Sequence, residues 1–157
     1  MDRAIFLERL AAGRRAWEEA LARVPEARMT EPCLEGGWSV KDVVAHVCWS
    51  EREMLGVLRE RALVGSELWA LGQDERNAAI HEENRDRPLA DILVEERATW
   101  EALRPGLEAL SAEDLVERAR FRGMSGMPEG ILPWRIFAGN TFIHHEEHAG
   151  QLAALAI

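Results

Sequence analysis

The sequence contains no tyrosine and only two cysteines. Without tyrosine, no mechanism can use a phenol as its acid or base. Cys33 and Cys48 form no C-x-x-C pattern and are too few for a disulfide framework, so we expect free thiols. The chain also lacks any apolar run of the roughly eighteen residues needed for a membrane helix. Residues 1–10 carry charges where a signal peptide needs an apolar stretch. These absences predict a cytoplasmic protein with no membrane partner.

Positive charge is scarce, because 28 acidic residues face 19 basic ones and the formal net charge is −9. Nucleic acids and anionic membranes require clustered Lys and Arg, so this balance argues against both as partners and leaves a small molecule. An apolar content of 47% is enough to build a core. At 157 residues, the chain is predicted to form one domain, residues 1–157.

Helical periodicity runs through most of the chain, with no convincing strand pair, repeat or low-complexity tract. The spacing of apolar residues predicts a helix over residues 6–24. A second helix begins after Ser39, which with Asp42 forms a variant of the capping box. Residues 74–85 could form a short polar helix, and a third long helix follows Pro88. Within that helix, the Pro105–Gly106 pair is expected to produce a kink or an interruption.

The last part of the chain is predicted to be a loop over residues 117–132 and then one helix. Ser111 can cap a short turn before the loop, and Pro133 opens the final helix, which extends past Leu152. Four long helices in a domain of this size indicate an all-α four-helix bundle with short extra helices in the connections. The interior of such bundles commonly hosts metal sites.

Three histidines carry the strongest indication of chemistry. His144 and His148 lie four residues apart, and therefore on one face of the last helix, whereas His46 lies in the second turn of the second helix. Three imidazoles can bind a metal ion and leave one coordination position open, as in catalytic zinc sites. Taken alone, His46 could equally be a hydrogen-bonded interior histidine, and the pair could lie on a solvated, charged face.

The motifs around these histidines resemble a known superfamily. The stretch Trp-Ser-Val-Lys-Asp-Val-Val-Ala-His, ending at His46, and the late His-x-x-x-His-x-Gly-Gln, ending at Gln151, are similar to those of the DinB/YfiT-like four-helix bundles. Its ClbS/DfsB branch is resembled more closely still, by Asn140–Thr141 followed by His144 and Glu147–His148, and by the stretch 84–89 with the later stretch 110–115. The resemblance implies a divalent metal, often zinc or nickel, bound by His46, His144 and His148. It also implies a homodimer, and relatives that are thiol S-transferases, a thiol-dependent isomerase or hydrolases.

The chain departs from these relatives at two positions. Ala149 stands where many members have arginine, and Phe142 stands where ClbS/DfsB relatives often have tyrosine. The metal-binding histidines are intact. The departures therefore concern the part of the site that selects the substrate.

Other polar residues near the triad are weaker candidates. His145 lies about a hundred degrees around the helix from His144 and is expected at the surface, as is His81. Cys48 should not share a metal with His46. Among the carboxylates, Glu51 is expected to face solvent, whereas Glu53 and Glu147 could orient a ligand imidazole or face solvent. Of the six tryptophans, which are mostly core residues, Trp49 is the best candidate for lining a pocket.

Three hypotheses follow. The first is a metal-dependent enzyme that acts on a small molecule through metal-bound water or a metal-bound low-molecular-weight thiol, as a hydrolase or thiol S-transferase. The alternative is a non-enzymatic protein that binds or sequesters a small molecule. The third is a purely structural helical dimer. Metal content separates the first hypothesis from the other two.

Overall fold

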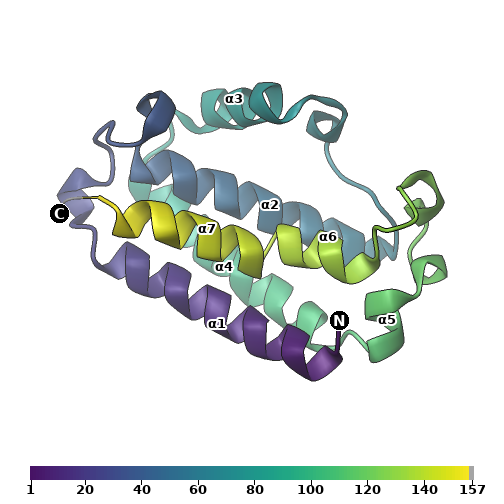
Figure 1. Cartoon of the computed structure of the whole chain (residues 1–157). Helices are drawn as coiled ribbons and strands as arrows, with labels where there is room; N and C mark the ends of the chain where they lie inside the picture. The colour runs from purple at the N-terminus through teal and green to yellow at the C-terminus, as the bar shows by residue number, and fades with distance from the viewer. Residues whose placement is uncertain (156–157) are drawn as a thin grey trace.

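Four helical rods lie side by side in the computed structural model, which describes residues 1–155 (Figure 1). Helix α1 (Arg3–Ala22) packs mainly against α7 (Phe142–Ala153), and α2 (Val40–Glu60) packs against α4 (Leu89–Glu108). Helix α6 (Pro133–Gly139) runs into α7, and together they form the fourth rod. The predicted all-α four-helix bundle is confirmed.

The connections contain the short elements. Helix α3 (Gln73–Asn84) lies along the outside of α2, and α5 (Ala112–Val116) follows α4 (Figure 1). Five 3₁₀ turns occupy other loops: Glu26–Arg28, Glu35–Gly37, Glu67–Ala70, Arg118–Arg120 and Met124–Gly126. Within residues 1–155 no strand forms, and an isolated bridge pairs Ala62 with Arg122. No helix of this part of the chain has the length and apolarity needed to cross a membrane.

The start of α2 is fixed as the sequence predicts. The backbone N–H of Ser39 donates to the Asp42 carboxylate at 2.8 Å, and the Asp42 N–H donates to the Ser39 hydroxyl at 3.3 Å. This reciprocal capping box satisfies two N–H groups that the first turn would otherwise leave free. It sets where α2 begins and so places His46 in the second turn.

Lys41, the only lysine in the sequence, attaches α3 to the start of α2. Its buried ammonium donates to the carbonyl oxygens of Asn84, Arg85 and Arg87 at 3.3, 2.5 and 3.2 Å. A cation at these carbonyls also complements the negative end of the α3 dipole. The polar helix α3 is thereby held beside the bundle although it buries only two of its own residues, Ile80 and Asn84.

The apolar core forms two groups. One surrounds Phe6, Leu103, Phe137 and Phe142, and the other surrounds Trp17, Val43, Ile92 and Leu152. Each group draws residues from all four rods. Burying either group therefore requires all four rods to pack together, and no single pair of helices is sufficient.

The single final helix predicted from Pro133 onwards was wrong, because the rod breaks at residues 140–141. The Thr141 hydroxyl donates to the Phe137 carbonyl at 2.6 Å, and the Asn140 amide donates to the Ile136 carbonyl at 2.9 Å. These side chains compete with backbone N–H groups for the carbonyls that would continue the helix.

Helix α4, in contrast, is not interrupted at Pro105 and continues to Glu108. Proline removes one backbone hydrogen bond, and here that loss falls in the last turn. The Ala109 N–H donates to the Pro105 carbonyl at 3.0 Å and closes the helix.

Candidate metal centre

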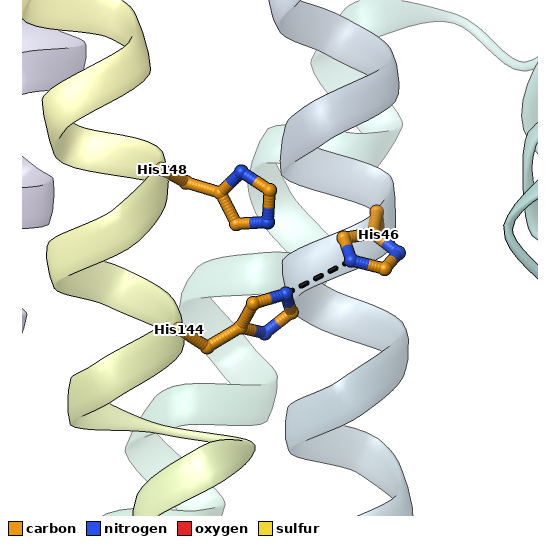
Figure 2. A group of neighbouring side chains, drawn as sticks. All are labelled: His46, His144 and His148. Carbon is orange, nitrogen blue, oxygen red and sulfur yellow. Dashed lines mark hydrogen bonds between the residues drawn. The ribbon is translucent and has the colours of Figure 1, made fainter. Parts of the chain in front are cut away.

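The three predicted histidines meet between α2 and α7 (Figure 2). His144 and His148 lie one turn apart on α7 and point toward His46 on α2. One ring nitrogen from each lies within 4.8 Å of the others, and the Nε2 atoms of His46 and His144 are 2.9 Å apart. The structure therefore brings together the residues that the sequence singled out; that they bind a metal stays a prediction.

The donor set fits a divalent transition metal. Two nitrogens on a tetrahedral zinc ion with Zn–N bonds of 2.0–2.1 Å are about 3.4 Å apart, within the range of distances found here. The Nε2–Nε2 contact requires one of these two atoms to carry a proton, whose place a cation could take. The Nδ1 of His148 donates to the Gln151 side-chain oxygen at 2.7 Å, which leaves Nε2 of His148 free to act as a ligand.

The electrostatics keep these imidazoles neutral. Burial, together with His148 and Arg76, lowers the pKa of His46 to about 4. Burial and the neighbouring histidines lower the pKa of His144 well below its usual value. Burial also lowers the pKa of His148, although the hydrogen bond that His148 donates to Gln151 opposes this shift. Metal ligands must be unprotonated, so near neutral pH the cluster is ready to bind a cation.

The histidines line a cleft of about 350 Å³ between α2, α3 and the α6–α7 rod. Trp49 also lines it, as predicted, and lies 5.1 Å from Trp69 between ring centroids. The half-buried Arg76 reaches in from α3, with its guanidinium carbon 4.9 Å from the Trp69 ring centre. Among the described lining residues, Glu147 is the only carboxylate, and it is exposed. The cleft thus offers a positive charge, aromatic surface and one proton acceptor.

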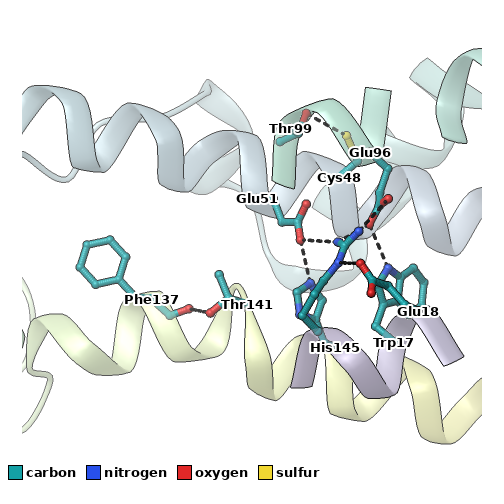
Figure 3. Close-up of polar contacts among 10 residues, drawn as sticks. Trp17, Glu18, Cys48, Glu51, Glu96, Thr99, Phe137, Thr141 and His145 are labelled. Atoms are coloured by element: carbon teal, nitrogen blue, oxygen red, sulfur yellow. Dashed lines mark hydrogen bonds and ion pairs between the residues drawn. The ribbon is translucent and has the colours of Figure 1, made fainter. Parts of the chain in front are cut away.

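Two sequence predictions beside the triad were wrong. His145 and Glu51, which were expected at the surface, are both fully buried, and Nε2 of His145 donates to the Glu51 carboxyl at 2.7 Å (Figure 3). Arg14 lies 3.4 Å from Glu51 and 2.5 Å from Glu96, and the Trp17 indole N–H donates to Glu96 at 3.0 Å. A buried polar cluster therefore takes Arg14 from α1, Glu51 from α2, Glu96 from α4 and His145 from α7.

Burial governs the ionisation of this cluster. Burial and the Glu96 carboxylate raise the pKa of Glu51 well above its usual value, although Arg14 opposes them. Burial and Arg14 lower the pKa of His145 to about 3. One signal in the sequence could have revealed His145: with Phe142, Ala149 and Leu152 it completes a helical stripe at spacings of three and four residues, and this stripe is the buried one.

The remaining candidates lie outside the cluster of three. His81 is neither core nor fully exposed: it is a third exposed and stacks on Trp38. Cys48 faces α4, where its sulfur lies 3.6 Å from the Thr99 hydroxyl, so it points away from the histidines as predicted. Glu53, left open by the sequence, is buried and accepts hydrogen bonds at 2.8 Å from the Ser66 N–H and the Trp69 indole.

Comparisons with known proteins agree with this architecture. An uncharacterised protein from Escherichia coli UTI89 has the same fold, with a TM-score of 0.76 and 12% sequence identity over 97% of this chain and 91% of that chain. A comparison with curated proteins gave no match. The closer resemblance to the ClbS/DfsB branch stays a prediction. Residues 10–146 match the family model described as the mycothiol maleylpyruvate isomerase N-terminal domain. The chain therefore belongs to this family, within the DinB/YfiT-like helical superfamily.

Proposed function

We propose that this chain is a metal-dependent enzyme that acts on a small electrophilic or hydrolysable molecule, with His46, His144 and His148 as the metal ligands. The proposal rests on the meeting of three neutral imidazoles from two helices at the wall of a cleft. Three protein ligands leave a coordination position for a reactant, whereas structural zinc sites use four.

A divalent cation bound by these ligands, zinc or nickel by its donor set, would lower the pKa of a coordinated water to about 7 or deprotonate a coordinated thiol. The protein side chains have separate tasks. Gln151 holds the tautomer and the orientation of the His148 ring. Glu147 can accept a proton at the cleft, and the Arg76 guanidinium favours reactants that carry negative charge.

A low-molecular-weight thiol is the better-supported nucleophile. The family to which the chain belongs is named for a mycothiol maleylpyruvate isomerase, and this supports thiol S-transfer or a related thiol-dependent reaction over hydrolysis. Cys48 cannot replace an added thiol, because burial raises the pKa of its thiol to about 11 and its sulfur faces Thr99.

A second candidate is a protein that binds a small molecule without transforming it. This is favoured by an apolar cavity of about 610 Å³ that adjoins the cleft and could hold a ligand by burial alone. The two candidates differ in whether the metal is needed for what the protein does.

Replacing His148 by alanine separates them, with His81→Ala as the matched control outside the triad. Untagged protein would be loaded with zinc or nickel, and its metal content, its thermal midpoint and the rate of thiol addition to a chromogenic electrophile would be measured. We expect H148A to lose metal affinity by more than the roughly 10–100-fold typical of losing an outer-shell partner. Activity should fall with the metal, while the fold and the control variant are unaffected.

The same variant identifies a wrong proposal. Full metal occupancy in H148A would remove His148 from the ligand set. A wild-type protein that binds zinc but neither transfers a thiol nor hydrolyses any electrophile tested would favour the second candidate.

A further inference from the structure

A second, apolar compartment adjoins the cleft with the three histidines. This apolar compartment, with a volume of about 610 Å³, is lined by Met54 and Val57 of α2, Ile136 of α6, and Val64 and Ala70 of the connection to α3. The two spaces share Trp69 and Asn140 as lining residues. The helix register explains why the two spaces are neighbours, since Met54 lies eight residues, or about 12 Å, beyond His46 along α2.

The compartment is covered by residues 62–72, which are fixed to α2. The Glu53 carboxylate accepts hydrogen bonds from the Ser66 N–H and the Trp69 indole, both at 2.8 Å. Gly65 lies so close that a Cβ there would be 2.2 Å from Glu53 and 2.5 Å from Trp69. These contacts hold the cover against α2, and a wall held in this way lowers the ordering cost of binding.

The lining of the two spaces is chemically different. Around the histidines, Arg76, Glu147 and Gln151 supply polar groups, whereas Met54, Val57 and Ile136 offer only apolar surface in the adjoining compartment. The two spaces border each other at Trp69, which lines both, is 37% exposed and packs beside Trp49. A molecule that fills both spaces must have a polar end and an apolar end.

Because a polar and an apolar space adjoin, we propose that the substrate class is an amphipathic small molecule. Its polar reactive head lies at His46, His144 and His148, and its apolar alkyl, acyl or aryl arm occupies the compartment at Met54, Val57 and Ile136. The assignment deepens the proposed function and rests on it, because the head is held at the metal centre. The arm supplies binding through apolar burial, and the metal centre supplies the chemistry.

A homologous series of alkyl hydroxamates tests both parts separately, because the head binds zinc and the arm varies. Zinc-loaded protein of measured metal content would be titrated calorimetrically with acetohydroxamate, butano-, hexano-, octano- and decanohydroxamate. Burial of each added methylene should raise affinity about fourfold until the compartment is filled. Beyond that length the affinity should level off.

Two variants locate the arm. Ala70→Trp fills the compartment and should weaken octanohydroxamate by at least roughly tenfold while acetohydroxamate is unaffected. Ile136→Ser, which keeps the space and makes its wall more polar, should weaken the long ligand by a smaller factor. Ala78→Trp on the exposed side of α3, which lines neither space, is the matched control.

The outcomes separate the two claims. If the protein takes up no zinc, or no hydroxamate binds at any length, the proposed function fails and this inference fails with it. If acetohydroxamate binds but affinity does not rise with length, the metal centre stands and the arm compartment is refuted. A length dependence that persists unchanged in both Ala70→Trp and Ile136→Ser would also refute it, because the arm would then lie elsewhere.

Discussion

Replacing Glu51 tests the buried polar cluster. Glu51→Leu removes the acceptor for His145, which lies 2.7 Å away, and leaves a buried N–H without a partner at a cost of about 1–3 kcal/mol in the free energy of unfolding. The cost should stay below the roughly 3–5 kcal/mol typical of a broken buried ion pair, because Arg14 keeps Glu96 at 2.5 Å. Glu51→Gln retains an acceptor oxygen, so its cost should be under about 1 kcal/mol.

Urea unfolding at neutral pH measures both variants, and an unchanged slope would show that the same surface is exposed on unfolding. The reasoning predicts that leucine costs more than glutamine. Equal losses in the two variants would show that the carboxylate charge, and not the hydrogen bond, stabilises the cluster. No loss in either variant would show that the contact with His145 contributes nothing.

The pH dependence of the same pair of proteins checks the ionisation of Glu51. Its pKa is raised by burial and by Glu96, so above the usual value of 4.5 the unfolded chain releases this proton while the folded protein keeps it. The contribution of Glu51 to stability therefore falls as pH rises, by at most about 1.4 kcal/mol per pH unit, until the folded carboxyl ionises. Glu51→Gln lacks this proton, so wild-type stability should decline relative to the variant as pH rises from 5. A constant difference would mean that Glu51 is ionised in the folded protein.

Three further predictions concern packing, the thiols and assembly. Gly13→Ala should lower the free energy of unfolding in urea by about 1–3 kcal/mol, because its Cβ would lie 2.7 Å from the Cβ of Phe142. The control Gly150→Ala, whose Cβ meets no atom within 4 Å, should raise it by about 0.5–1 kcal/mol. Equal effects of the two substitutions would contradict the close approach of α1 and α7. Iodoacetamide at pH 8 should label the exposed Cys33 in the folded protein and spare Cys48, because a pKa of about 11 leaves about one Cys48 thiol in a thousand ionised. Mass spectrometry measures the two labelling rates, with urea-unfolded protein as the control. Equal rates in the folded protein would show that Cys48 is not buried. Light scattering should give the mass of a two-fold homodimer, and a strict monomer at high concentration would contradict this expectation.

The sequence could predict the meeting of the three histidines because the signals are local. Two histidines at a spacing of four residues share a helix face, and the capping box at Ser39 fixes the helix that carries His46. The bundle alone does not determine which way His46 faces; the resemblance to the DinB/YfiT-like superfamily supplied the expectation that it joins His144 and His148.

The buried cluster could not be predicted in the same way, because its partners are distant in sequence. His145 and Glu51 are 94 residues apart, and Arg14 and Glu96 are 82 residues apart. Charged residues are rarely fully buried unless paired, so a carboxylate without a visible partner is assigned to the surface. The break at Thr141 was missed for a different reason, since the contact is local. A threonine hydroxyl in a helix can either face solvent or donate to the carbonyl four residues earlier, as Thr141 does to Phe137, and the sequence does not distinguish the two.

The attachment of α3 by Lys41 has a consequence for amine chemistry. Apart from the histidines, all the other basic side chains of this protein are arginines. The ammonium of Lys41 donates hydrogen bonds to three carbonyl oxygens at the end of α3 and just beyond it. Acylating reagents and lysine-modifying enzymes require a free amine, so they can reach this side chain only when α3 separates from α2. Acylation would then remove both the charge and donors that hold α3, and the helix could not return to its place beside the cleft that it covers. One covalent modification would thus convert a transient opening into a permanent one.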